Sequence, residues 1–580
     1  MKGGEMSKIL RINAKEKTFY FEEPSEELSG LGGRALTSKL ILNEVPGTCH
    51  PLSAANKLVI APGLLAGTAA ANSGRLSAGA KSPLTGGIKE SNSGGLVAQK
   101  LARLKIQALV IEDKPENDGY SIIVIKKDSV EILSADEYAG AGNYEVMGKL
   151  WEKYGENTGI MSIGQAGEQC LKAASIQQAD PKGRPSRALG RGGLGAVMGS
   201  KKIKAIVVDD KGCERISPAD AKAFKTANKR WVGMLNQHPV TGQGLAGFGT
   251  AILVNIVNEA GAFPTKNFRS GRFDNAGDIS GEKMVELMEK RGGITAEGCH
   301  PGCVMKCSQV YNDKDGNYLT SGFEYETIWA MGAHTTIHDF DDIAMLDRLC
   351  DDYGVDTIET GVSLGIAMEG GLIAWGDGKA AIELLKKVGK GSIEGKIIGN
   401  GSVFTGDALG IDRVPAVKRQ ALPAYDPRSV KGVGVTYATS PMGADHTAGY
   451  GVTANILSVG GTVDPLQKEG NIELSKNLQI ATAAIDAAGL CLFVAFAVLD
   501  NEDGVQTIVD LLNAQYALSL TTDDVMALGK SIINDEREFN KLAGFTKFDD
   551  QLPEMFKENF PPHNTKWDFS VDELQEAVNF

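Results

Sequence analysis

The hydrophobic pattern divides the chain into an early part that predicts strands and a later part that predicts helices. Short runs of β-branched and aromatic residues, bounded by Gly, Asp, Asn or Pro, are typical of strands. In the early part they lie at 9–12, 17–22, 57–61, 108–112, 120–126 and 204–208. Apolar residues spaced by three and four positions are typical of helices. Later in the chain they lie at 218–236, 280–291, 340–353, 357–375, 380–390, 474–488 and 505–516.

This order of elements predicts an α+β fold with a β-rich part followed by helical parts. A chain of 580 residues has room for about three to four domains of ordinary size. We expect a β-rich domain over 1–210 and mostly helical domains over 211–415 and 416–580.

Composition and charge narrow the class of protein. The net charge of -13 argues against general nucleic-acid binding, which needs a basic face. The start of the chain lacks the apolar region of a secretory signal, and the longest apolar run, Leu490–Leu499, is about half of a membrane span. We therefore expect a cytoplasmic protein without a membrane span. Eight cysteines are too few for a disulfide framework, so clustered cysteines predict metal ligands.

Three cysteines lie close together in Cys299-His-Pro-Gly-Cys303-Val-Met-Lys-Cys307. The Pro and Gly between them break any helix, so the thiols sit on a loop that can surround one metal centre. A fully protein-bound [4Fe–4S] cluster needs a fourth thiolate from elsewhere. Structural zinc is the alternative, but zinc sites favour paired C-x₂₋₄-C units and only one such group is present. Three unrelated buried cysteines are the remaining interpretation.

Two segments with the pattern D-x-x-G-h-(D/C), where h is apolar, follow amphipathic runs: 351–356 and 486–491. The glycine fits the left-handed position after a helix end, and either segment alone is most simply a helix stop. Together, the two segments indicate a ligand-binding role in addition to ending helices. Cys491 supplies the missing fourth thiolate, and a carboxylate at each helix end can accept hydrogen bonds from an amino-substituted heterocycle. Two such ends predict two copies of one ligand.

A basic, glycine-rich run reverses the acidic character of the chain at 181–204. Glycine-rich backbone with flanking cations is typical of a phosphate site. It is neither a Rossmann fingerprint nor a Walker A loop. An earlier run, 72–95, sets Arg75 and Asn92 among small residues, which would suit a large flat anionic ligand. The alternatives are a solvated basic turn for the first run and an ordinary loop for the second.

The helical part also holds two candidates for proton transfer. Glu326 lies in the run F-E-Y-E-T-I-W, and His446 ends the run S-P-M-G-A-D-H. A carboxylate and an imidazole are a common general acid–base pair. His334 and His338 are nearby rivals for the imidazole.

Together these residues resemble the tungsten-containing aldehyde:ferredoxin oxidoreductase family. The resemblance runs from about Arg75 to Cys491 and rests on the two D-x-x-G-h-(D/C) segments, G-R-G-G-L-G-A-V-M-G-S-K and E-Y-E-T-I-W. It implies a β-sandwich-like first domain that carries pterins, with two helical domains over it. It also implies one tungsten, or molybdenum, held by two pyranopterins with no protein atom on the metal, a [4Fe–4S] cluster and Mg²⁺.

The resemblance assigns roles to matching residues. Cys299, Cys303, Cys307 and Cys491 would bind the cluster. Arg75 would bridge cluster and pterin, and Asn92 with the backbone at Ala188 would hold the magnesium between pterin phosphates. Glu326 would act as general base, and His446 would hydrogen-bond the substrate carbonyl. The cofactor-binding residues would be Arg75, Asn92, Gly94, Gly95, Arg184, Arg187, Ala188, Gly190, Arg191, Gly192, Asp351, Asp356, Asp486, Leu490 and Cys491.

The implied reaction converts an aldehyde and water into a carboxylic acid, and ferredoxin or an iron–sulfur subunit takes the electrons. The chain departs from the family in its C-x₃-C-x₃-C spacing, where C-x₂-C-x₃-C is familiar, and it lacks the Glu-x-x-His before Asp351 that bridges subunits in some members. Three alternatives stay open: reduction of aromatic acyl thioesters or carboxylic acids within the same family, a radical-SAM enzyme, and a metal-stabilised structural subunit. Homo- or hetero-oligomeric assembly also stays open.

Overall fold

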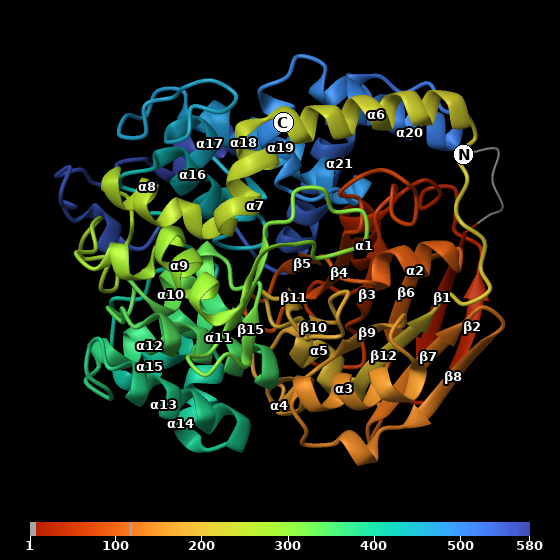
Figure 1. Ribbon diagram of the computed structural model, residues 1–580, viewed down its shortest axis with the longest axis horizontal. Coiled ribbons are helices and arrows are strands. Elements are labelled where there is room, and N and C mark those ends of the chain that lie inside the picture. The colour runs from red at the N-terminus through yellow and green to blue at the C-terminus, as the bar shows by residue number, and fades with distance from the viewer. Residues whose placement is uncertain (1–6, 117–118, 580) are drawn as a thin grey trace.

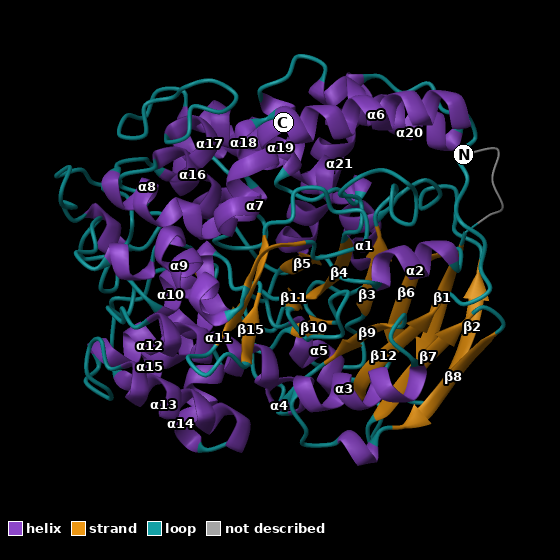
Figure 2. Ribbon diagram, in the orientation of Figure 1, coloured by secondary structure: helices purple, strands orange, loops and turns teal. Residues whose placement is uncertain are grey.

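The computed structural model describes residues 7–116 and 119–579. Strands gather in the first part of the chain and helices dominate the rest, as Figure 1 and Figure 2 show. The predicted α+β class is confirmed.

Two six-stranded sheets form the N-terminal part. The first has the order β2, β1, β6, β3, β4, β5, with the bounds Thr18–Glu22, Lys8–Asn13, Ile106–Glu112, Leu58–Pro62, Leu76–Lys81 and Ile88–Ser93. The second has the order β11, β10, β9, β12, β7, β8, with the bounds Arg187–Leu189, Ile176–Gln178, Gly159–Ser162, Ile203–Asp209, Ser121–Lys126 and Ser129–Ser134. Each sheet has one parallel pair, β1 with β6 and β12 with β7, among antiparallel neighbours.

One hydrophobic core lies between these two sheets. Leu10 and Leu109 from the first sheet share it with Ile123 and Val207 from the second, and all four side chains are fully buried. Two sheets that bury alternate residues against each other form a sandwich. The sandwich-like first domain implied by the resemblance is therefore present.

In the described part of this region, five α-helices accompany the sheets, although the sequence pattern predicted only strands and turns there. They are α1, α2, α3, α4 and α5, with the bounds Gly33–Glu44, Val97–Arg103, Asn143–Tyr154, Gln165–Glu168 and Leu194–Ser200. Helix α1 covers the outer face of the first sheet, where Leu36 and Leu40 pack against Val59 and Val110. Its other side contacts helices of the C-terminal part.

The remaining chain is mostly helical. The helices up to residue 409 are α6 to α15, with the bounds Ala221–Gln237, Leu245–Phe248, Leu253–Glu259, Gly281–Arg291, Tyr325–Met331, Phe340–Tyr353, Thr357–Glu369, Gly378–Lys390, Ile393–Gly399 and Ser402–Leu409. Those after it are α16 to α22, with the bounds Lys431–Thr439, Val452–Asn455, Asn471–Ala488, Val494–Leu499, Gly504–Tyr516, Thr522–Leu542 and Val571–Gln575. A small sheet, β13–β15, interrupts the first group, with the bounds Ile294–Glu297, Ser308–Asn312 and Tyr318–Ser321. A two-stranded sheet links the groups, with the bounds Ala416–Val417 and Gln420–Ala421.

Most predicted helices are present, and α11 has the predicted bounds. The helix predicted over 357–375 is shorter, since α12 ends at Glu369 and a glycine pair follows it. Glycine loses the most backbone freedom on ordering, so a pair of glycines favours the end of a helix. The sheet β13–β15 was not predicted. The division of the helical part near residue 415 stays a prediction.

One described segment, Val240–Glu259, is long and apolar enough to cross a bilayer by length and composition alone. It is not one regular helix, because Gly249 has a φ of 60° and separates α7 from α8. Leu253, Val254 and Val257 pack into the largest hydrophobic core. The segment therefore has a place in the folded core.

Candidate functional site

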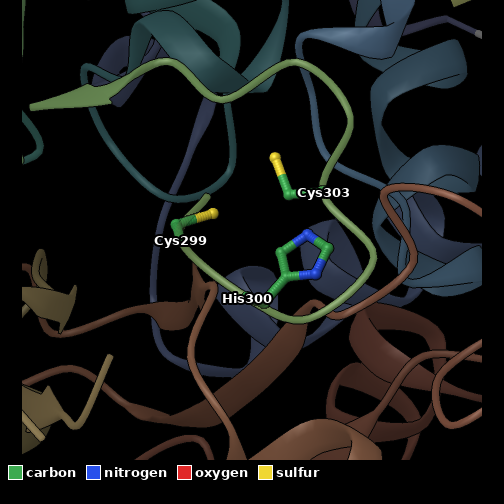
Figure 3. A group of neighbouring side chains, drawn as sticks. All are labelled: Cys299, His300 and Cys303. Atoms are coloured by element: carbon green, nitrogen blue, oxygen red, sulfur yellow. The ribbon is translucent and has the colours of Figure 1, made fainter. Parts of the chain in front are cut away.

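The three clustered cysteines lie on the loop between β13 and β14, and Cys491 follows the end of α18. All four are free thiols. Figure 3 shows Cys299, His300 and Cys303 close together on one turn of this loop, and their ligand atoms lie within 4.8 Å of one another. The thiol of Cys299 hydrogen-bonds to Cys303 and lowers the pKa of Cys303 to about 7. Burial raises the pKa of Cys307 well above its usual range, and the nearby thiols of Cys299, Cys491 and Cys303 raise it further. Burial also raises the pKa of Cys491 to about 11.

Asn72 joins the two parts of the chain that carry these cysteines. Its backbone N–H donates to Gly302 at 3.0 Å, and its carbonyl accepts from the N–H of Cys491 at 2.9 Å. Its side-chain amide donates to Sγ of Cys303 at 3.4 Å. Asn72 makes all three contacts with a φ of 59°. Asparagine tolerates this left-handed conformation better than most other residues do. The sequence analysis did not single out Asn72, because its partners lie far away in the chain.

Arg75 and Gly94 connect the cysteine loop with a cavity. Nε of Arg75 donates to the side-chain oxygen of Asn92 at 2.6 Å, and both residues line the cavity. A Cβ atom built on Gly94 would lie 2.9 Å from Sγ of Cys299 and 3.4 Å from Nη1 of Arg75, so the guanidinium lies beside the cysteine loop. Gly94 lies against the sulfur of Cys299, and Gly95 donates its N–H to the carbonyl of Cys299 at 3.0 Å. That Arg75 bridges a cluster and a pterin stays a prediction.

The cavity encloses about 810 Å³ of space free of protein atoms, part of it open to solvent. It lies where β5 and β11, from the two sheets, meet the helical part near the centre of Figure 1. Its lining is rich in ionisable side chains, which are Arg34, Arg75, Lys89, Glu90, Arg191, Asp445, His446 and Asp486, and it also includes Asn92, Ala188 and Gly190. Burial raises the pKa of Glu90 to about 8, so this carboxyl is largely protonated at neutral pH. Arg34, Lys89 and Arg191 are paired with Glu536, Asp445 and Asp356. Arg75 donates to the neutral amide of Asn92, so its positive charge favours an anionic ligand.

His446 lines this cavity and contacts Glu326, which comes from a segment far away in the sequence. Glu326 stands in the first turn of α10, where Oε2 accepts from the N–H of Ala424 at 2.9 Å. Oε1 lies 3.4 Å from Nε2 of His446 and has no hydrogen-bond partner. Burial raises the pKa of Glu326 to about 8 and lowers the pKa of His446 to about 4. Although the contact is close enough for an ion pair, the neutral forms of both groups are favoured.

Aromatic side chains surround this pair. The rings of Tyr425 and Tyr450 lie 6.3 Å and 6.1 Å from that of His446, and their hydroxyls are 2.5 Å apart. The hydroxyl of Tyr437 is buried without a hydrogen-bond partner. Hydroxyls and rings of this kind bind a small organic molecule through both polar and apolar contacts. The sequence analysis missed these tyrosines, because they belong to no motif.

The rival histidines lie elsewhere. His334 is fully buried against Trp329 and Phe268, with ring centroids 5.1 Å and 5.9 Å away. Burial lowers its pKa to about 3, so it is a neutral core residue. His338 is half-exposed and lies 3.3 Å from Asp278. Of the three predicted histidines, His446 alone lines the cavity.

The glycine-rich basic run contributes to the cavity unevenly. Arg191 lines it and donates to the carbonyls of Ala421 and Ala444 at 2.6 Å and 2.7 Å. Arg184 is held by the carboxylates of Asp180 and Glu297. Several other cations of the run also have partners inside the protein: Arg187 donates to Ser308, Lys201 donates to backbone carbonyls, and Lys204 pairs with Glu168. The phosphate site predicted here stays a prediction, and Ala188, Gly190 and Arg191 are its members on the cavity wall; Gly192, with a φ of 86°, is the next residue in the chain.

The two D-x-x-G segments do end helices, with Gly354 and Gly489 in the left-handed conformation. Asp486 lines the cavity and accepts from Arg34 at 3.2 Å. Asp351 is buried at the end of α11, and burial raises its pKa well above the usual range. Asp356 begins α12 as its N-cap and lies 3.2 Å from Nε of Arg191. Leu490 is fully buried beside Cys491 in one hydrophobic cluster.

These residues fit the two implied cofactors. Four free thiols on two neighbouring segments are the donor set of a [4Fe–4S] cluster. Around the cavity, Oε1 of Glu90, Oε1 of Glu326 and Nδ1 of His446 are buried without hydrogen-bond partners. Buried polar atoms in proteins normally have partners, so these atoms indicate a polar ligand. Arg34 and Lys89 also line the cavity and were missed by the sequence analysis.

Comparison with known proteins gives two family matches. Residues 9–210 match the family model "Aldehyde ferredoxin oxidoreductase, N-terminal domain", and residues 226–579 match "Aldehyde ferredoxin oxidoreductase, domains 2 & 3". The chain is 37% identical over 579 residues to the tungsten-containing aldehyde ferredoxin oxidoreductase of Pyrococcus furiosus, covering 96% of this chain and 92% of that protein. The protein of the same name from Thermococcus kodakarensis is also 37% identical, with the same coverage.

More distant relatives share the fold. The WOR-like subunit of an aliphatic sulfonate oxidoreductase from Pyrococcus furiosus is 26% identical and covers 96% of this chain and 90% of that protein. Among solved structures, the active-site complex BamBC of benzoyl coenzyme A reductase with 1,5-dienoyl-CoA matches with a TM-score of 0.81 at 19% identity. That match covers 99% of this chain and 93% of the other.

Proposed function

The chain belongs to the aldehyde ferredoxin oxidoreductase family. We propose that the protein oxidises an aldehyde to a carboxylic acid in the cavity described above. The reaction takes one oxygen atom from water and releases two protons and two electrons. One observation carries the proposal: a single cavity is lined by His446, which lies 3.4 Å from Glu326, and by Arg75, which lies beside the cysteine loop at Gly94. The Glu326–His446 pair suits proton transfer, and the position of Arg75 beside the cysteine loop suits the exit of electrons.

The relatives are named tungsten-containing, which implies a tungstopterin in this family. When bound, the tungsten or molybdenum bis-pyranopterin supplies a Lewis acid and a two-electron acceptor. Asp486, Asp351 and Asp356 would accept hydrogen bonds from its heterocycles. Asn92 and the backbone at Ala188 would hold Mg²⁺ beside the pterin phosphates, and the guanidinium of Arg75 on the cavity wall supports the placement of these anions.

Glu326 is the proposed general base. Its carboxylate form would take a proton from the attacking water, and the raised pKa makes that form a stronger base than an exposed carboxylate. His446 stays neutral because burial lowers its pKa. Its ring N–H would donate to the carbonyl oxygen of the substrate and stabilise the negative charge that develops there.

The electron exit is proposed at the four-cysteine loop with a [4Fe–4S] cluster. Arg75 and Cys491 would connect the cavity with that loop. Pro301 and Gly302 are exposed on the same loop, which gives a redox partner a short approach. Ferredoxin or a dedicated iron–sulfur subunit would accept the electrons. The reducing cytoplasm suits a protein whose cysteines must remain free thiolates for a cluster.

Elemental analysis of anaerobically purified protein tests the cofactors. We expect about four irons per chain, as one four-iron cluster requires, with about one tungsten or molybdenum. Zinc as the sole metal would contradict the proposal. Iron without tungsten or molybdenum would favour the radical-SAM alternative.

Turnover with a dye acceptor tests the reaction. We expect the aldehyde to be oxidised, with little activity on an alkanesulfonate or an aromatic acyl thioester. Glu326→Gln should abolish aldehyde oxidation while the metal content stays unchanged. Glu324→Gln is the control, because Glu324 is a partly buried glutamate of the same segment that accepts a hydrogen bond from Thr250. Near-normal turnover in Glu326→Gln would remove Glu326 from its role, and activity on the thioester alone would replace the proposed substrate.

A further inference from the structure

Helix α6, which lies across the top of the molecule in Figure 1, carries cations and no acids. The whole chain has a net charge of -13, yet the charged side chains of this helix are Lys222, Lys225, Lys229 and Arg230. Arg230 pairs with Asp510 of the neighbouring helix α20. The three lysines are exposed and have no ion-pair partner among the described residues. Their charges are therefore available to a partner outside the chain.

The three lysines lie on one side of α6. Lys225 is three residues after Lys222 and four residues before Lys229, and residues at these spacings are neighbours on the surface of a helix. Like charges at such spacings destabilise a helix. The positive stripe therefore does not serve the stability of α6, and binding of a negatively charged partner explains it better.

The buried face of α6 packs on the cysteine loop 299–307. Phe224 and Trp231 of the helix share one hydrophobic cluster with Met305 and Cys307 of the loop. Helix α6 thus covers the apolar side of this loop, while its lysines face solvent. The positive stripe and the proposed electron exit therefore belong to one region of the surface.

The segment 69–72 connects the lysine side of α6 with the exposed tip of the loop. Asn228 follows Lys225 by three residues, so the two side chains are neighbours on the helix. The side chain of Asn228 donates to the carbonyl of Ala69 at 2.9 Å and accepts from the N–H of residue 71 at 3.3 Å. Asn72 then donates its N–H to the carbonyl of Gly302 at 3.0 Å. The stripe therefore continues toward the tip of the cysteine loop.

The cysteine loop adds a fourth exposed cation. The N–H of Lys306 donates to Sγ of Cys303 at 3.4 Å, so this lysine stands directly beside a proposed cluster ligand. No large apolar side chain of α6 or of the loop 299–307 is exposed. Interfaces of permanent complexes are large and apolar, whereas weak electron-transfer complexes have small interfaces. This surface has the character of the second kind.

We propose that a small acidic electron carrier docks transiently on the surface made by Lys222, Lys225, Lys229 and Lys306. This inference rests on the proposed function, because the carrier takes the electrons that leave through the cysteine loop. Oxidation of one aldehyde releases two electrons, so a carrier of one electron must bind and leave twice in each turnover. A charged surface with little apolar area suits this exchange, since it speeds association without making the complex permanent. It also offsets the repulsion between an acidic carrier and the negative charge of the whole protein.

Charge reversal tests the docking surface. The probe is a purified acidic ferredoxin with two iron–sulfur clusters, and biolayer interferometry at low ionic strength gives its dissociation constant from the holoenzyme. Lys225→Glu/Lys229→Glu should raise this constant about tenfold. The matched control Lys390→Glu/Lys396→Glu makes the same charge change at exposed positions of α13 and α14, at the opposite side of the molecule in Figure 1, and should leave the constant unchanged. Added salt should weaken binding of the unmodified protein more than that of the α6 variant.

Binding of the ferredoxin needs no turnover, so its outcome is separate from that of the proposed activity. Steady-state rates give a second measurement: the α6 variant should have a higher KM for the ferredoxin, with unchanged aldehyde oxidation when an uncharged quinone is the acceptor. A ferredoxin that does not bind the unmodified protein, or that binds the α6 variant equally well, would overturn the proposal. So would an equal loss of binding in the control, or an iron–sulfur subunit that stays bound to the chain through a wash in high salt.

Discussion

Nε2 of His446 lies 3.4 Å from Oε1 of Glu326, yet burial favours the uncharged forms of both side chains. A pair at this distance on a protein surface would be an ion pair. Here little water remains to stabilise the separate charges, so the pKa of the carboxyl rises to about 8 and that of the imidazole falls to about 4. Between pH values of about 4 and about 8, the carboxyl of Glu326 is therefore protonated and the imidazole of His446 is neutral. The proposed base is therefore mostly protonated at neutral pH.

This proton predicts a pH dependence of aldehyde oxidation. The carboxylate of Glu326 becomes available as pH rises through about 8, so kcat/KM should increase up to that pH and then level off. At two pH units below the pKa, about 1% of the base is ionised, so the rate there should be roughly 100-fold below the plateau. Initial rates between pH 6 and pH 10, with metal content measured in parallel, check this. A profile that is flat over this range would exclude the Glu326 carboxylate as the base.

His446 should not contribute to this profile, because its pKa of about 4 lies below the measured range. His446→Asn should lower kcat while the rising limb near pH 8 remains. His338→Asn is the matched control, since His338 is half-exposed and pairs with Asp278. If His446→Asn shifts the limb instead, the titrating group is the pair and not Glu326 alone.

Gly94 is predicted to be essential for the metal cluster. A Cβ atom at this position would lie 2.9 Å from Sγ of Cys299, closer than real Cβ contacts, so Gly94→Ala must displace the thiol. We expect the iron content per chain to fall well below that of the unmodified protein, with the loss visible in the absorption of the cluster. Gly233→Ala is the control, because a Cβ on this helical glycine meets nothing within 4 Å. A full complement of iron in Gly94→Ala would contradict the prediction.

The fold could be predicted where the pattern of side chains is regular. Helix α11 has one buried face and well-defined ends, so its bounds were predicted without error. Helix α1 was missed because it packs against the first sheet on one side and against helices α18 and α21 on the other. Burial on several sides removes the period of three and four that marks a surface helix. Strand β5, with the sequence IKESNS, was missed because its buried positions are mostly polar.

The candidate site could be predicted where residue types cluster in sequence. The spacing of Cys299, Cys303 and Cys307 predicted a metal loop, and the structure places Cys491 near them. Arg34 and Asn72 could not be found in this way. Arg34 contacts Glu536, 502 positions away, and Asn72 contacts Cys303, 231 positions away. Only folding brings such partners together, and one sequence carries no local signal for them.

Arg34 gives a last prediction, because it stabilises both the fold and the cavity. Its guanidinium donates to Glu536 at 2.8 Å and 2.9 Å and to Asp486 at 3.2 Å, and the Glu536 side chain is fully buried. Arg34→Met would leave the Glu536 carboxylate buried without its cation, which should cost about 3–5 kcal/mol of unfolding free energy. The double variant Arg34→Met/Glu536→Gln should recover much of that loss, because the unpaired charge is gone. Chemical denaturation of the purified proteins measures both effects, and Arg230→Met, which breaks a half-exposed ion pair with Asp510, is the control. If the double variant is no more stable than Arg34→Met, the buried charge is not the cause of the loss, and packing of the Arg34 side chain must account for it.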